Sequence, residues 1–274
     1  MSVQVGETVK SGPAVCKLCS TETSAILVSK DGHDVYECRT CGLAFTHPQP
    51  PALADQYDSA YFDLYRRRRS FRLKRAAARL KAIERLREPG RLLDIGCSLG
   101  YFVEAACARG WRASGIEISP VAANEAQEAG LDVAPGVLED AAFPDGSFDC
   151  VTMWDVLEHV SDPVRQMLEV HRILVDGGLV VVGTPDLGHV LFRLKGERWR
   201  HLKPAEHIFY FKKATIKRLL SQAGFRPVRP PLIGGRNFPG SAQAALRCSL
   251  ARVFQPNDVM IVYGVKSDLQ IPQH

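Results

Sequence analysis

Residues 92–100 read Leu92-Leu93-Asp94-Ile95-Gly96-Cys97-Ser98-Leu99-Gly100. An apolar run that leads directly into a glycine-containing turn predicts a short buried strand followed by the first turn of a helix. Glycine allows the backbone of such a turn to approach a ligand closely, beside the unsatisfied amide groups of the helix N-terminus. The stretch therefore predicts a ligand-binding turn between a strand and a helix.

The acidic residue Glu117 makes this prediction more specific. It ends the next predicted strand, Gly115-Ile116-Glu117, and follows Asp94 by 23 residues. At that place a carboxylate can bind both ribose hydroxyls of an adenosine cofactor. The sequence does not contain the three-glycine motif of dinucleotide-binding proteins, because Val103 occupies the position of the third glycine. The turn and Glu117 together predict an adenosine cofactor.

Strand-like and helix-like segments alternate from Arg91 onward. The predicted strands are 91–95, 113–118, 149–154, 179–183 and 259–265. The predicted helices are 101–109, 120–129, 164–174 and 215–223. This alternation predicts an α/β fold with a parallel, doubly wound sheet and helices on both of its faces.

The glycine turn resembles the first motif of the class I S-adenosylmethionine-dependent methyltransferases, with Ser98 in place of the middle glycine. Residues 143–160 resemble the fourth strand of that family and its loop, and residues 177–181 the turn into its fifth strand. The resemblance covers about residues 88–266 and implies a Rossmann-like, seven-stranded methyltransferase sheet that binds S-adenosylmethionine. The implied cofactor-binding residues are Asp94, Gly96, Cys97, Ser98, Gly100, Tyr101, Phe102, Glu117, Ile118, Leu138, Glu139, Trp154 and Asp155.

Four cysteines form two Cys-x-x-Cys pairs, Cys16 with Cys19 and Cys38 with Cys41, separated by 18 residues. This spacing is typical of a zinc ribbon, in which four thiolates close a tetrahedral shell around one zinc ion. Free thiols or two disulfides would fit the same spacing. The other four cysteines are scattered singly, and the first ten residues lack an apolar stretch of signal-peptide length, so zinc is favoured. With all four positions filled by protein, the zinc would be structural.

The composition excludes several classes of protein. Hydrophobic residues make up 46% of the 274 residues and charged residues 24%, which is the balance of an ordinary globular protein and not of a disordered or fibrous one. No apolar run approaches the ~18 residues that a membrane span needs. We therefore expect a cytoplasmic protein without a membrane span.

The sequence predicts several parts. They are a flexible N-terminus at 1–13, a zinc-ribbon-like module at 14–46, a proline-rich connector with a basic amphipathic helix at 47–88, a methyltransferase domain at 89–266 with an acceptor-site insertion at about 186–212, and a tail at 267–274. The cysteine pairs followed by Gly42-Leu43-Ala44-Phe45, prolines and tyrosines resemble a subset of the family in which a zinc module precedes the catalytic domain. That subset includes methyltransferases of sugars and other small metabolites, so the resemblance implies a small-molecule acceptor.

Residues 66–87 carry a local net charge of +10, whereas the whole chain carries +5. We expect an amphipathic helix whose arginines face outward and attract an anionic acceptor, such as a phosphorylated or nucleotide-linked molecule. A nucleic-acid substrate is the alternative, but Phe71 is the only aromatic residue in the run, so no base-stacking platform is predicted. A solvated helix face at a domain junction would also fit the charge pattern. For the whole protein, a further alternative is a non-catalytic cofactor-binding scaffold that uses the zinc module as an interaction surface.

Three residues are candidates for the catalytic chemistry. His207, supported by Glu206, is predicted to be the general base, with His159 as its competitor. Methylation of oxygen is favoured over methylation of carbon. The alternative is that Glu206 and His207 only anchor the insertion.

A second metal site is predicted beside these residues. Asp155, Glu158 and His159 are spaced to lie on one face of a helical turn. Similar residues in the ubiquinone-pathway O-methyltransferases coordinate a divalent cation, and the resemblance implies such a site here. A hydrogen-bonded network that braces the loop is the other interpretation.

Overall fold

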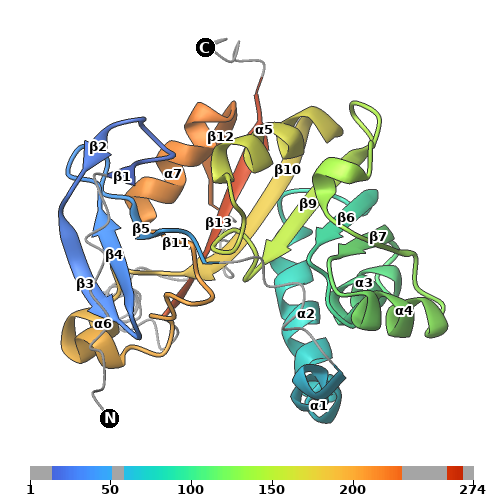
Figure 1. The fold of residues 1–274 in the computed structure, drawn as a ribbon. Helices are drawn as coiled ribbons and strands as arrows, with labels where there is room; N and C mark the ends of the chain where they lie inside the picture. Colours follow the sequence, from blue (N-terminus) through green and yellow to red (C-terminus); the bar gives the residue numbers. More distant parts are fainter. Residues whose placement is uncertain (1–13, 51–58, 230–257, 268–274) are drawn as a thin grey trace, which may run out of the picture.

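The computed structural model describes residues 14–50, 59–229 and 258–267. A seven-stranded sheet with the order β12-β13-β10-β9-β6-β7-β8 forms its centre (Figure 1). Its strands are β6 (Arg91–Ile95), β7 (Arg112–Glu117), β8 (Val133–Pro135), β9 (Phe148–Trp154), β10 (Leu174–Pro185), β12 (Phe225–Val228) and β13 (Val259–Lys266). The predicted N-terminal segment 1–13, residues 51–58 of the connector and the tail from 268 onward lie outside the described residues.

The predicted seven-stranded, Rossmann-like sheet is confirmed, with one correction to its strand directions. The strands β10, β9, β6, β7 and β8 run parallel to one another. The strand β13 instead lies antiparallel to both β10 and β12, so the sheet is mixed. The apolar pattern of a strand reports its burial and not its direction, which explains why the sequence predicted parallel pairing throughout.

Helices cover both faces of the sheet, as predicted. On one face, Leu93 and Val180 pack with α5 (Pro163–Ile173) and α7 (Lys213–Gln222). On the other face, Leu92 and Leu179 pack with α2 (Arg69–Ile83), α3 (Tyr101–Cys107) and α4 (Pro120–Glu128). Neighbouring residues of one strand thus enter different cores, because successive side chains of a strand point to opposite faces.

The cysteine-containing module is built from two small sheets. The strands β1 (Ala14–Val15) and β2 (Glu22–Thr23) form a hairpin. The second sheet has the order β11-β5-β4-β3, formed by β3 (Ile26–Lys30), β4 (His33–Glu37), β5 (Ala44–His47) and β11 (Phe209–Tyr210). The strand β11 comes from the predicted acceptor-site insertion, so the sheet of the module includes residues from the far half of the chain (Figure 1).

The insertion packs mainly against this module. It contains α6 (Val190–Lys195) and a 3-10 turn at Gly196–Arg198. Its Trp199 and Leu202 lie in one apolar cluster with Val35 and Ala44 of the module. The segment therefore ties the module to the main sheet.

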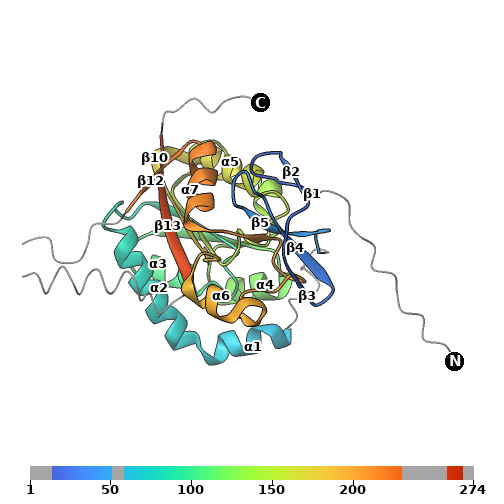
Figure 2. The same cartoon turned by 90° about the vertical axis from the view of Figure 1, so that its left-hand side faces the viewer.

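The basic segment forms two helices and not one. The helix α1 (Ser59–Arg67) and α2 are separated at Arg68, which lacks helical dihedral angles (Figure 2). The prediction that the arginines face outward is wrong for Arg72 and Arg79, because their guanidinium groups stack on Tyr65 and Trp154. A guanidinium can bury its flat face against an aromatic ring, so a positive charge alone does not place an arginine in solvent. Among the described residues, no helix is both long and apolar enough to cross a membrane.

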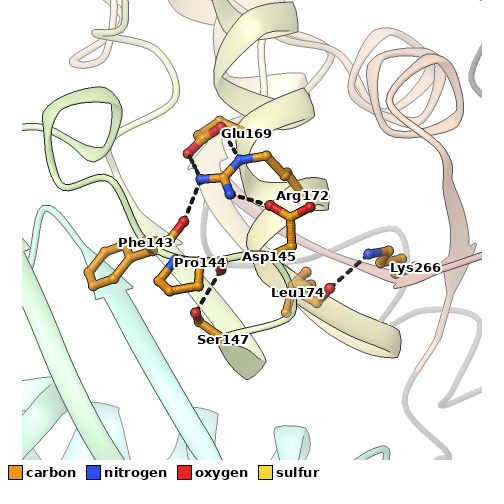
Figure 3. A network of polar contacts seen from close by, with 8 residues as sticks. All are labelled: Phe143, Pro144, Asp145, Ser147, Glu169, Arg172, Leu174 and Lys266. Atoms are coloured by element: carbon orange, nitrogen blue, oxygen red, sulfur yellow. Dashed lines mark hydrogen bonds and ion pairs between the residues drawn. The ribbon is translucent and has the colours of Figure 1, made fainter.

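The loop before β9 is anchored to α5 by Arg172 (Figure 3). The guanidinium donates to the carbonyl oxygen of Phe143 over 2.7 Å and pairs with the carboxylates of Glu169 and Asp145. A 3-10 turn, Leu138–Asp140, precedes this loop. These contacts fix the start of β9, whose other end reaches the site described next.

Candidate functional site

A cavity of about 870 Å³ lies at the carboxyl ends of the central strands. Ile95, Glu117 and Trp154 are the last residues of β6, β7 and β9, and all three line it. The strand β6 lies between β7 and β9, so the cavity lies where the strand order reverses, the usual ligand site of an open α/β sheet. The predicted cofactor-binding residues that line the cavity are Asp94, Gly96, Cys97, Ser98, Tyr101, Phe102, Glu117, Ile118, Leu138, Glu139, Trp154 and Asp155.

The turn after β6 requires glycine at two positions. Gly96 has φ +68°, and a Cβ atom there would lie 2.4 Å from Cγ2 of Val156. Gly100 is the one predicted cofactor-binding residue that does not line the cavity. It precedes the first residue of α3 and adopts a left-handed φ of +73°. Ser98 also adopts a left-handed φ of +52°, a conformation that costs a non-glycine residue about 1 kcal/mol or more.

Glu117 is buried and held in one orientation. Its two carboxylate oxygens accept hydrogen bonds from the backbone amides of Ser98 (2.7 Å) and Ser119 (2.9 Å). Burial raises the pKa of Glu117, and these amides oppose that rise. The remaining lone pairs of the carboxylate are available to hydroxyl donors in the cavity.

Asp94 connects two neighbouring strands. Its side chain is buried and accepts a 2.6 Å hydrogen bond from the hydroxyl of Thr152 on β9. Burial raises its pKa to about 7, against the opposing effects of Thr152 and Arg79. Asp94 therefore links β6 to β9 at the wall of the cavity.

Arg79 is a site residue that the sequence analysis missed. Its guanidinium lies 3.8 Å from the ring centre of Trp154, and its Nη2 atom is buried without a hydrogen-bond partner. Burial, and next Arg75, lower its pKa to about 10, so it stays positively charged at neutral pH. The signal was its position next to Leu80 and three residues after Ala76, both of which face the core.

Two further polar atoms at this end of the cavity, Oγ of Ser98 and Nε1 of Trp154, are also buried without a partner. Buried donors normally have an acceptor, and leaving one unpaired costs about 1–3 kcal/mol. A ligand that places a carboxylate beside Arg79 and Ser98 would remove this cost. The donor set therefore fits the amino-acid end of S-adenosylmethionine, and Glu117 fits its ribose.

His159 faces the cavity, whereas His207 lies behind it. Nδ1 of His159 is 2.9 Å from the carbonyl oxygen of Glu206. A carbonyl only accepts, so in the neutral ring Nδ1 carries the proton and Nε2 is the free base. Burial lowers the pKa of His159.

His207 is 6% exposed, and its ring centre lies 4.7 Å from that of His159. Burial, with the neighbouring His159, lowers its pKa to about 2. The carboxylate of Glu206 pairs with Lys203 at the surface. Among the residues that the structure describes, His159 is the only predicted catalytic residue that lines the cavity. Of the described residues of the predicted acceptor-site insertion, only Ile208 lines it.

The structure gathers a slightly different candidate metal set from the predicted one. Ligand atoms of Glu158, His159 and His207 lie within 4.8 Å of one another, whereas Asp155 lines the cavity outside this group. Glu158 is buried and accepts a 2.9 Å hydrogen bond from the hydroxyl of Thr184. The divalent cation stays a prediction.

The four cysteines of the module converge as predicted. Sγ of Cys16 lies 3.5 Å from that of Cys41, and Sγ of Cys19 lies 3.5 Å from that of Cys38. These separations exceed a disulfide bond of about 2.0 Å and approach the ~3.8 Å between sulfurs that each lie ~2.3 Å from a tetrahedral zinc. The thiol geometry fits one zinc ion.

Comparison with known proteins identifies the family. The sequence profile described as "Methyltransferase domain" matches residues 65–229. The chain is similar to the ubiquinone biosynthesis O-methyltransferase of Xanthomonas oryzae, at 30% identity over 46% of this chain and 62% of that protein. It is also similar to an uncharacterised protein of Methanocaldococcus jannaschii, at 26% identity over 55% of this chain and 71% of that protein.

A solved structure shares the fold. It is a chain of the complex between the Trm112 methyltransferase activator and a methyltransferase of Haloferax volcanii, with a TM-score of 0.58 and 19% identity. The match covers 80% of this chain and 99% of that one. At this identity the likeness supports the fold alone.

Proposed function

The chain belongs to the methyltransferase domain family, and from this membership we propose that it transfers a methyl group from S-adenosylmethionine to a small anionic acceptor, with oxygen favoured as the accepting atom. The observation that carries the proposal is the cavity at the strand ends. It combines a glycine turn, an oriented carboxylate at Glu117 and unpartnered buried donors beside Arg79. Each is suited to a different part of that cofactor.

We assign the binding roles by position. Glu117 would hold the ribose hydroxyls, Leu138 and Glu139 would lie near the adenine, and Arg79 with Ser98 would hold the carboxylate. S-adenosylmethionine, when bound, supplies a methyl group already activated by its sulfonium. The protein then needs to orient the acceptor and to remove its proton.

His159 is suited to take that proton. Nε2 is its free base, and the bond from Nδ1 to Glu206 fixes the tautomer of the neutral ring. His207 remains a prediction as the base, but its burial behind His159 favours a supporting role. The cavity position of His159 therefore makes it our candidate for the general base.

Cofactor binding gives the first test. Glu117→Ala removes the carboxylate that would accept from the ribose, and charge-assisted hydrogen bonds contribute about 1.5–3 kcal/mol each. We expect calorimetry to show at least a tenfold weaker affinity for S-adenosylhomocysteine. Glu128→Ala, an exposed residue near the end of α4, is the control and should bind like the wild type. Equal affinity in both variants would remove the cofactor assignment.

We also propose that Cys16, Cys19, Cys38 and Cys41 hold one structural zinc. The strand β5 connects this site to the cavity. Thr46 of β5 donates from its hydroxyl to the carbonyl of His207 over 2.8 Å, and its amide donates to the carbonyl of Ile208 over 2.8 Å. The module thereby fixes the peptide segment whose Glu206 carbonyl orients His159.

Replacing Thr46 with Val tests this connection. The change keeps the shape of the side chain but leaves the buried carbonyl of His207 without its donor, which costs about 1–3 kcal/mol of unfolding free energy. We expect roughly tenfold lower turnover, a shifted pH profile and unchanged affinity for S-adenosylhomocysteine. Thr23→Val is the matched control, because Thr23 donates to Glu37 within the module. If both variants lose turnover equally, Thr46 has no special role at the site.

A further inference from the structure

The helix α2 places three arginines along one wall of the cavity. Arg72, Arg75 and Arg79 stand at positions i, i+3 and i+7 and all line it. Seven residues of α-helix span about 10 Å, so the first and last of these side chains start two turns apart. Arg79 lies at the inner end, over Trp154. The other two reach a more distant part of the same cavity.

Arg72 and Arg75 differ from other cations of this segment in their partners. Arg66 pairs with Glu125, and Arg69 pairs with Glu104. Within the residues that the structure describes, neither Arg72 nor Arg75 forms an ion pair with a carboxylate. Two positive charges therefore line the cavity without a direct ion-pair partner in the described part of the chain.

The guanidinium of Arg72 is held in a defined orientation. Its central carbon lies 3.4 Å from the ring centre of Tyr65, and its Nε atom is buried without a hydrogen-bond partner. Stacking uses the flat face of a guanidinium and leaves its N–H groups at the edge free to donate. This edge matches the two oxygens of a phosphate or carboxylate group.

Aromatic side chains of α1 surround this position. Tyr61, Phe62 and Tyr65 line the same cavity, and the hydroxyl of Tyr61 lies 3.3 Å from that of Tyr65. Tyr61 is 44% exposed, which places it at the mouth of the cavity. An acceptor bound here would meet aromatic surface beside its anionic group.

We propose that Arg72 and Arg75 form a second anion site, separate from Arg79, that binds the phosphate or carboxylate group of the acceptor while its ring lies against Tyr61 and Tyr65. This inference rests on the proposed function, and it identifies the chemical group by which the enzyme would recognise its acceptor. It assigns Arg79 to the cofactor and the outer arginines to the acceptor.

A small anion suits these residues better than a nucleic acid. A polymer would contact cations on the outer surface of the helices, such as Arg67 and Lys74, which are exposed. Arg72 instead has a buried Nε atom and lines the cavity. The two classes of ligand therefore depend on different faces of α2.

The test is calorimetric titration of inorganic pyrophosphate into protein saturated with S-adenosylhomocysteine, with succinate as a parallel carboxylate probe. We expect Arg72→Gln and Arg75→Gln each to weaken binding of at least one probe about tenfold. Lys74→Gln is the matched control, because it removes the same charge from an exposed position of the same helix. Its affinity should equal that of the wild type.

Other results would overturn the proposal. Wild-type protein that binds neither probe, or an equal loss in Lys74→Gln, would leave only a diffuse positive field. A 20-residue single-stranded RNA that binds more tightly than pyrophosphate, with Lys74→Gln weakening it as much as Arg72→Gln, would favour a nucleic acid.

Two controls separate the anion site from other failures. The same titrations without S-adenosylhomocysteine show whether the anion site exists even if cofactor binding, and with it the proposed function, fails. If Arg72→Gln does not fold, Arg75→Gln still decides the outcome, because Arg75 is exposed at the cavity edge.

Discussion

Replacing His159 with Gln is expected to lower turnover about 100-fold while the affinity for S-adenosylhomocysteine stays unchanged. The imidazole of His159 faces the cavity with Nε2 unprotonated, because Nδ1 donates to the carbonyl of Glu206. Glutamine keeps a similar size but offers no base, and losing a positioned base costs about 100-fold or more. The measurement is methyl incorporation into an acceptor found by screening ring compounds that carry a phosphate or carboxylate.

His207→Gln is the matched control for this prediction. His207 contacts His159 but lies behind it, outside the cavity lining. We expect a smaller loss of turnover, accompanied by lower stability, because the side chain is almost fully buried. If His207→Gln abolishes turnover and His159→Gln does not, the base is His207 and the position of His159 has been misinterpreted.

The pH profile of the wild type gives an independent readout of the same assignment. Burial lowers the pKa of His159 below its ordinary value of 6.5. A general base acts when it is unprotonated, so turnover should be retained as the pH falls to 6.5 and be lost only below that value. An acidic limb centred above pH 6.5 would contradict His159 as the titrating group.

Removal of zinc should abolish methyl transfer and unfold the module, while cofactor affinity changes little. Metal binding contributes on the order of 10 kcal/mol to small zinc modules, which have too little core to fold without it. The strand β11 belongs to the sheet of this module, so its unfolding would release the segment that orients His159. The residues that line the cofactor end of the cavity come from the main sheet and its helices.

This prediction is checked by elemental analysis, amide hydrogen exchange and calorimetry on chelated protein and on Cys38→Ser. Loss of protection should concentrate in β3, β4 and β5 and extend to β11. Cys107→Ser, an exposed cysteine outside the cluster, serves as the control. Protein that contains no zinc when purified without chelators, yet transfers methyl groups normally, would contradict the metal site.

Several features could be predicted because they depend on neighbouring residues alone. The strand at 91–95, its glycine turn and the acidic end of the next strand all follow from local patterns, and all reach the cavity. The cysteine spacing predicted the cluster, since four thiols at such intervals can meet after two tight turns. Residue chemistry and spacing along the sequence are therefore enough to predict these features.

Other features were decided only by the tertiary structure. The sequence places Arg79 beside the core residue Leu80 but gives no sign of its contact with Trp154, which is 75 residues away. The choice between His159 and His207 depends on which ring lines the cavity, and His207 lies just before β11, which pairs with the distant strand β5. The direction of β13 likewise depends on how the chain returns to β10. Each of these contacts joins segments that are far apart in the chain. The local hydrophobic pattern and residue spacing therefore cannot predict them.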